Sequence, residues 1–167
     1  MAGTIAEHID GLLAADKRLL GKPDWVEGPR EDQLRWSAPL AIDDETIGMK
    51  IIIDAYPHFP NGQKFSIHLT CPTAIWRVEC TEYASHVNTN PCPEGVIPGL
   101  LRGPHHHSWP DNRHLATQQS PPNQLKFARP LAANIQGLEN TIRWFCDETK
   151  IVIDFEIPNL PKASRLI

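Results

Sequence analysis

The chain lacks any apolar run near the length of about 20 residues that a membrane-spanning helix requires. It also lacks a signal-like apolar segment at its start, because Met1-Ala2-Gly3-Thr4 leads directly into an amphipathic stretch. We therefore expect a cytoplasmic protein that has no membrane partner.

Cysteine is scarce and is not spaced for metal binding. No Cys-x-x-Cys pair occurs, and paired spacings of that kind are typical of zinc and redox motifs. In a chain of 167 residues, too large for a disulfide-stapled miniprotein, we expect free thiols. The cysteines are Cys71, Cys80, Cys92 and Cys146.

A strong excess of one charge is missing as well. The 20 acidic and 16 basic residues give a net charge of -4, which argues against nonspecific binding of nucleic acid by bulk charge. A local basic strip stays compatible with these numbers. With 41% hydrophobic residues, the length predicts a single domain over residues 1–157, followed by a loosely docked tail over 158–167.

The spacing of apolar residues predicts a helix followed by an antiparallel meander. Thr4 and Glu7 can form a capping box, and apolar residues keep helical spacing from Ile5 to Leu20. Alternating polarity then predicts two strands joined by an acidic turn, and two more after a proline-rich break and an Asn61-Gly62 turn. These strands are expected at 34–42, 47–53, 65–69 and 76–80.

The second half of the chain begins with a His/Pro-rich irregular region from Ser85 to Pro130. Such a stretch is either disordered or functional, and its His and Trp content favours function. Beyond it, Asn134 is expected to cap a C-terminal helix, and the alternation over 151–157 predicts an edge strand. The fold class expected is α+β, with an antiparallel meander packed on helices.

The strongest chemical signal is the run of three histidines after Pro104. In an extended chain His105 and His107 project from one face and His106 from the other, so the first two form half of a metal site, for example for zinc or manganese. Imidazole also serves as an acid and base near neutral pH, so catalysis without a metal and a structural role both stay open. The candidates for a third ligand are His86, His114, Glu79, Glu94 and Asp111.

Two other groups of residues are candidates for binding a substrate. Arg77 and Glu79 share one face of a strand, and His68 on the preceding strand would lie near them, so they form either an active-site floor or a solvent-facing ion pair. Trp109 can stack on a base and Arg113 can bind phosphate, which suits a nucleotide or RNA. Alternatively, Trp109 anchors a loop to the core.

The sequence around two of the cysteines predicts their surroundings. Cys92, between two prolines, is the most exposed-looking thiol, with His86 as the only nearby imidazole that could activate it. Cys146 fits the core side of the C-terminal helix.

From Trp76 to Ile151 the order of short motifs resembles an uncharacterised bacterial family whose pattern runs R-x-D, H-x-N-P, D/E-G and P-H-x-H. The P-H-x-H stretch also resembles small toxin components of toxin–antitoxin pairs. The resemblance implies a bacterial mobile-element or defence context. The matching segments are Arg77-x-Glu79, His86-x-Asn88, Glu94-Gly95, Pro104-His105-x-His107 and Ala128-Arg129-Pro130-Leu131.

The predicted order of elements, with the Tyr56-Pro57-x-x-Pro60 break and the His86-x-Asn88 element, resembles a ubiquitin-conjugating E2 or RWD domain. In that family a thioester-forming cysteine follows a His-Pro-Asn element. Here Val87 takes the place of the proline, and the three histidines stand where the family has its cysteine. The resemblance thus implies the fold and a role in protein interaction.

Two functional hypotheses follow, and the sequence leaves open whether the protein is an enzyme. In the first, a bacterial mobile-element or defence protein acts on a phosphodiester or nucleotide through a histidine site. His105 and His107 would bind a metal or share proton transfer, helped by Glu79 and His86, while Arg77, Trp109 and Arg113 would hold the substrate. In the second, the chain is a non-catalytic E2-like module that binds a protein partner.

Overall fold

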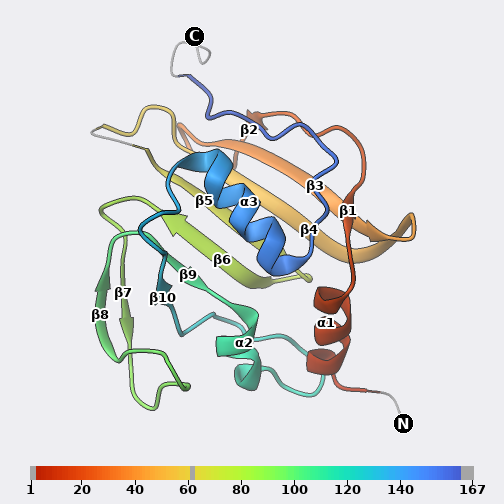
Figure 1. Ribbon diagram of the computed structural model, residues 1–167, viewed down its shortest axis with the longest axis vertical. Helices are drawn as coiled ribbons and strands as arrows, with labels where there is room; N and C mark the ends of the chain where they lie inside the picture. The colour runs from red at the N-terminus through yellow and green to blue at the C-terminus, as the bar shows by residue number, and fades with distance from the viewer. Residues whose placement is uncertain (1–2, 61–62, 163–167) are drawn as a thin grey trace.

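The protein has an α+β architecture in which one antiparallel sheet carries a helix across one face (Figure 1). The computed structural model describes residues 3–60 and 63–162. The sheet is built around a four-stranded meander of β3 (Leu34–Ile42), β4 (Glu45–Ala55), β5 (Phe65–Thr70) and β6 (Ala74–Cys80). The elements before it are α1 (Ile5–Ala14), β1 (Arg18–Leu19) and β2 (Val26–Glu27). Those after it are β7 (Ser85–Asn88), β8 (Gly99–Arg102), β9 (His105–His107), α2 (Trp109–Asn112), a 3-10 turn (Arg113–Leu115), β10 (Arg129–Pro130) and α3 (Gly137–Thr149).

The meander confirms the prediction from alternating polarity. Asp43 and Asp44 both have positive φ, at 50° and 64°, and join β3 to β4 in a two-residue turn. Positive φ at both central residues is what a tight hairpin turn requires, and Asp tolerates it better than most residues. The Asn61-Gly62 turn predicted before β5 lies outside the described residues.

The strand order is β1-β3-β4-β5-β6-β9-β10, and β2 also pairs with β3. The histidine run is thus the strand β9, which extends the meander beyond β6. A separate ribbon of β7 and β8 lies at one side of this sheet (Figure 1). The region from Ser85 to Pro130, predicted to be irregular, therefore contains four short strands and α2.

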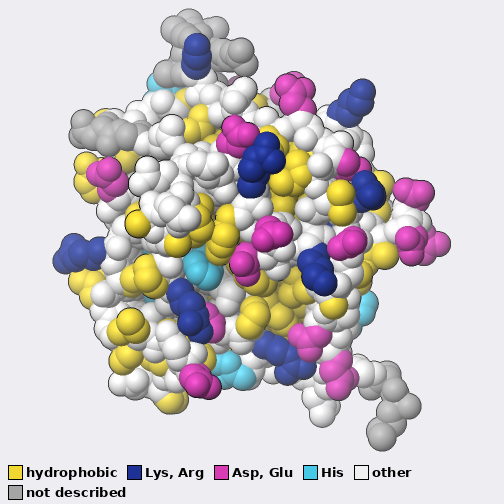
Figure 2. All heavy atoms as spheres, in the orientation of Figure 1, with side chains coloured by type: hydrophobic (Ala, Val, Ile, Leu, Met, Phe, Trp, Pro, Cys, Tyr) yellow, Lys and Arg dark blue, Asp and Glu magenta, His cyan; other side chains and the backbone are white. Residues whose placement is uncertain are grey.

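The hydrophobic core lies between α3 and the sheet. Ile53, Ile67 and Val78 are fully buried in neighbouring strands, and Ile142 and Phe145 of α3 belong to the same cluster. Each such side chain contributes about 1.5–3 kcal/mol through burial. Figure 2 looks onto the side of the molecule that α3 covers, where charged side chains of both signs are scattered among apolar and uncharged atoms.

The first helix is shorter than predicted. Its capping box between Thr4 and Glu7 is present, but α1 ends at Ala14 rather than near Leu20. The buried ammonium group of Lys17 donates hydrogen bonds to carbonyl groups at the end of the helix, including that of Leu12 at 2.7 Å. Its burial lowers the pKa of Lys17 to about 8. Residues 18–19 then pair with β3, so sheet pairing replaces the last predicted turn.

Two predictions for the C-terminal part were wrong in detail. The N-cap position of α3 is occupied by Gln136, not Asn134, and the Gln136 side chain makes no capping hydrogen bond. No strand forms over 151–157, where Ile151 makes a single bridge to Lys17. The apolar residues of this segment pack on the core without ladder pairing. None of the helices in the described ranges is long and apolar enough to cross a membrane.

Candidate functional site

The sheet face opposite α3 carries two adjacent rows of polar residues, which we call the polar rows. Their members face each other across neighbouring strands in register, and alternation along each strand places them on one side. The first row consists of Arg35, Asp54, Ser66, Glu79 and His105. The second row consists of His68, Arg77 and His107. The rows thus bring together residues from five strands.

Two adjoining hollows lie along the polar rows, and we refer to them together as the groove. The first has a volume of about 410 Å³ and the second about 350 Å³. They share Lys64, Arg77 and Glu79, and the second reaches His105. The charged residues that line the first hollow are Arg30, Arg35, Lys64, Arg77, Asp54 and Glu79.

Arg77 and Glu79 lie on the same face of β6 as predicted, with 3.3 Å between Arg77 Nε and Glu79 Oε1. Burial raises the pKa of Glu79, and the charges of Arg77 and Lys64 only partly oppose that effect. The carboxyl group therefore holds its proton at a higher pH than an exposed glutamate does. His68 lies beside this pair, directly across from Arg77 on β5.

Three histidine rings meet at the β9 end of the groove. The ring of His86 lies 4.6 Å from that of His107 and 5.9 Å from that of His105, and the latter two are 5.2 Å apart, centroid to centroid. His106 points to the other side of the sheet, where its ring lies 4.9 Å from that of Trp144 on α3. The expected division of the histidine run between two faces is thus confirmed.

Hydrogen bonds fix the orientation of each of these rings. His86 Nε2 donates to the carbonyl of Lys126 at 2.6 Å, and His105 Nδ1 donates to that of Gly103 at 3.0 Å. His107 Nε2 accepts from Arg77 Nη2 at 3.3 Å, because a guanidinium can only donate. His107 is fully buried, so it orients the Arg77 side chain rather than facing solvent.

The imidazoles of the polar rows are neutral near pH 7. Burial lowers the pKa of His68 to about 4, and it also lowers the pKa of His105. Burial and then the charge of Arg77 lower the pKa of His107 to about 2. Neutral rings can accept protons or hydrogen bonds, while the positive charge of the groove comes from its arginines and lysine.

The metal site predicted at His105 and His107 stays a prediction. Within residues 3–60 and 63–162, no group of three or more His, Cys, Asp or Glu side chains is arranged to hold a metal ion. Arg77 also places a positive charge against His107. Among the proposed third ligands, His86 and Glu79 lie beside this pair, whereas His114 stacks on Phe127.

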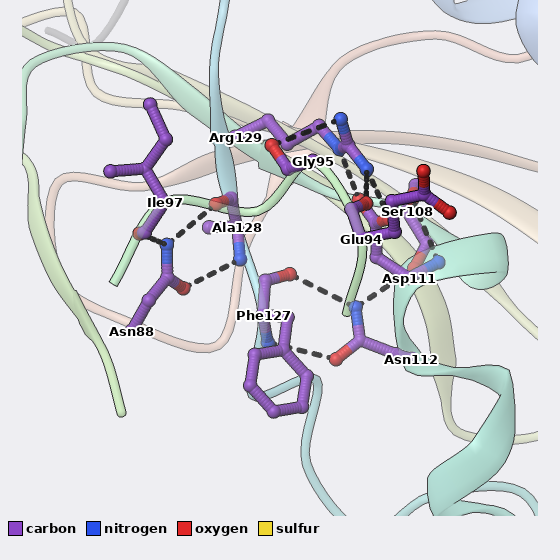
Figure 3. A network of polar contacts seen from close by, with 10 residues as sticks. All are labelled: Asn88, Glu94, Gly95, Ile97, Ser108, Asp111, Asn112, Phe127, Ala128 and Arg129. Carbon is purple, nitrogen blue, oxygen red and sulfur yellow. Dashed lines mark hydrogen bonds and ion pairs between the residues drawn. The ribbon is translucent and has the colours of Figure 1, made fainter. Parts of the chain in front are cut away.

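Two asparagines hold the chain segment that fixes His86 (Figure 3). Asn88 accepts from the backbone N–H of Ala128 at 2.9 Å and donates to its carbonyl at 2.8 Å. Asn112 makes the same two bonds to Phe127, at 2.9 and 3.0 Å. Together with His86, they clamp residues 126–128. The motif His86-x-Asn88 does not predict this role by itself, because the partners of the two side chains are brought to them only by the fold.

The side chain of Arg129 joins three segments of the chain (Figure 3). Arg129 binds both carboxylate oxygens of Asp111, at 2.7 and 2.8 Å, and also the carbonyls of Glu94 and Gly95. Burial by itself raises the pKa of Asp111, but the bonds and charge of Arg129 outweigh it and lower the pKa. Gly95 has φ of 83°, and a Cβ there would lie 2.8 Å from Arg129 Nη1. Arg129 therefore holds the loop around Glu94 and Gly95 in place. The carboxylate of Asp111, a candidate third metal ligand, is already bound to Arg129.

Trp109 and Arg113 do not line the groove. Only 2% of Trp109 is exposed, and its indole N–H donates to Asp10 of α1 at 2.8 Å. Arg113 forms an ion pair with the same carboxylate at 2.7 Å. A buried ring offers no stacking face, so the predicted substrate-binding role of Trp109 gains no support. Its burial agrees with the alternative, an anchor to the core.

The cysteines lie away from the groove. All four are free thiols, as expected. Cys92 is half-buried, and its thiol lies 3.5 Å from the carbonyl oxygen of Thr89. Cys146 is buried in the core side of α3, and burial raises its pKa to about 12.

Comparison with protein-family models, curated proteins and solved structures finds no match to this chain. The resemblances to a bacterial family and to ubiquitin-conjugating domains therefore stay predictions.

Proposed function

We propose that the groove binds a phosphodiester or nucleotide, and that Glu79 and the neighbouring histidines transfer protons during its cleavage. The observation that carries this proposal is the lining of one hollow by four cationic side chains, together with a carboxyl group of raised pKa and the neutral imidazole of His68. A substrate of this class also suits the mobile-element or defence setting that the bacterial resemblance implies.

The arrangement of charges favours an anion. Arg35 is paired with Asp54 and Arg77 with Glu79, whereas Arg30 and Lys64 form no ion pair within the described part of the chain. Lys64 Nζ instead lies 4.5 Å from the ring centroid of Tyr56. Two unpaired cations next to two guanidinium groups can neutralise a phosphate and fix its oxygens through paired hydrogen bonds.

The same hollow contains groups suited to proton transfer. A carboxyl group whose pKa is raised by burial can donate a proton to a leaving oxygen, and a neutral imidazole can accept one from a nucleophile. Glu79 and His105 face each other across β6 and β9 at the point where the two hollows join. Acid and base would thus both lie within reach of one bound substrate.

Calorimetric titration with pyrophosphate and with a nucleoside monophosphate tests the binding step. We expect the Lys64→Gln variant to bind at least about tenfold more weakly, which corresponds to about 1.4 kcal/mol. Arg143→Gln is the matched control, because Arg143 lies on α3 and pairs with Glu139 four residues away. Absence of binding by the unaltered protein, or equal loss in both variants, would overturn the proposal.

A second candidate function, binding of a protein partner, is favoured by apolar residues on and beside the β7–β8 ribbon. Val87 and Leu100 pair across the ribbon with 54% and 56% of their surface exposed, and Ile97 is 75% exposed. If this patch docks a ubiquitin-like protein, Leu100→Glu should abolish the complex in a pull-down with that purified protein. Pyrophosphate binding should not change in this variant.

A further inference from the structure

The floor of the first hollow contains a serine and a histidine in direct contact. Ser66 Oγ and His68 Nε2 lie 2.9 Å apart, and both residues line the hollow. They are two positions apart on β5, so strand geometry alone directs both side chains to the groove. A hydroxyl within hydrogen-bond reach of an imidazole is the geometry of an activated nucleophile and its base.

We infer that Ser66 is a nucleophile and His68 its general base, acting on the phosphodiester that the groove is proposed to bind. This inference rests on the proposed function for the nature of the substrate. It adds the reacting atom, which the histidine-centred interpretation of the sequence left out.

The groups around the pair suit this role. Asp54 lies across from Ser66 on β4, but both of its oxygens are held by Arg35, at 2.8 and 3.0 Å. No hydrogen bond joins Asp54 to His68 within the described residues, and Asp54 acts on the imidazole through its negative charge. On the other side, Glu79 lies across from Ser66 on β6. Arg77 lies next to His68 and Glu79, and its guanidinium group can stabilise negative charge on the phosphorus-bound oxygens.

The reaction balances with water as the only co-reactant. Ser66 Oγ attacks phosphorus, its proton passes to His68 Nε2, and the bond from phosphorus to the leaving oxygen breaks while protonated Glu79 supplies that oxygen with a proton. In the second half, a water molecule attacks the phosphoserine and gives a proton to Glu79. The bond between phosphorus and Ser66 then breaks, and Ser66 regains its proton from His68. The net change is hydrolysis of one ester bond.

A fluorophosphonate probe tests the inference directly, because a nucleophilic serine displaces fluoride and retains the phosphonyl group. We expect a single adduct by intact-protein mass spectrometry, located at Ser66 by peptide mapping. Ser66→Ala should abolish the adduct, and His68→Asn should slow its formation by about 100-fold, the lower range for loss of a general base. Ser120→Ala is the matched control, because Ser120 is an exposed serine that contacts Thr117 and does not line the groove, and it should label at the normal rate.

The outcomes separate this inference from the proposed function. An unlabelled Ser66 in unaltered protein that binds pyrophosphate overturns the inference and leaves the proposed function standing. Equal labelling of the His68→Asn variant also overturns it, provided that near-UV circular dichroism shows that variant to be folded. Labelling at Ser66 without any binding of pyrophosphate or nucleotide supports the nucleophile and overturns the proposed function instead.

Discussion

The two faces of the central sheet are built from alternate residues of the same strands, and they differ sharply in composition. On β6, Val78 is fully buried in the core, while Arg77 and Glu79 on either side of it line the groove. Unpartnered buried nitrogens occur on both faces, for example on Trp76 and His107. The two faces therefore differ in the charge of their side chains. Residues of the core and residues of the groove thus alternate along β6.

This division has a consequence for strand register. Because side chains alternate along a strand, a slip of one residue would bury the polar rows and expose the core. The register is thus fixed by the apolar face, and the polar rows inherit their alignment from it. Breaking one face should leave the other largely intact, provided that the sheet itself survives.

The largest expected effect comes from the apolar face. Phe145→Ala removes a fully buried ring of α3 and should lower the free energy of unfolding by about 3–5 kcal/mol, because a cavity is left in the core. Urea unfolding measures this loss. The pyrophosphate affinity of the folded protein should stay within about twofold of normal, which is far less than the tenfold change that about 1.4 kcal/mol of binding free energy would cause. A parallel loss of affinity would show that the two faces are coupled.

A smaller effect is expected from the histidine on the apolar face. Burial lowers the pKa of His106 to about 4 from 6.5, so the unfolded chain binds its proton more readily than the folded protein does. The stability that this group lends is complete above pH 6.5 and is lost as the pH falls from there towards 4, by at most about 1.4 kcal/mol per pH unit. His106→Phe should reduce the slope of unfolding free energy against pH in this window. The exposed His8→Asn should keep the full slope, and equal slopes in the two variants would contradict the assignment.

The smallest effect on stability should come from the polar face. Glu79→Gln removes a carboxyl group whose charged form is disfavoured by burial, so the free energy of unfolding at pH 7 should change by less than about 1 kcal/mol. The adjacent Val78→Ala should cost about 2 kcal/mol, because its methyl groups are in the core. Thermal unfolding compares the two variants. A larger loss in the glutamine variant would show that Glu79 serves the fold rather than the groove.

Local pattern was enough to predict the meander and the two faces of the histidine run, because alternation depends only on neighbours in the chain. It failed for the end of α1, where Lys17 binds the last carbonyls, and for 151–157, where apolar alternation reflects packing without pairing. Ser66 escaped notice because a serine on the polar side of a strand is unremarkable until its contact with His68 is known. The position of His86 beside β9 depends on contacts across 40 residues of chain, which no local pattern contains.

The clamp around residues 126–128 bears on how this protein can change over evolution. A primary amide offers the same donor and acceptor as a peptide group, so Asn88 and Asn112 act as single-residue substitutes for a paired strand. The connection over 116–125 can therefore lengthen, shorten or diverge while the imidazole of His86 keeps its place. Variation there would leave the groove intact, because no residue of 116–125 lines it.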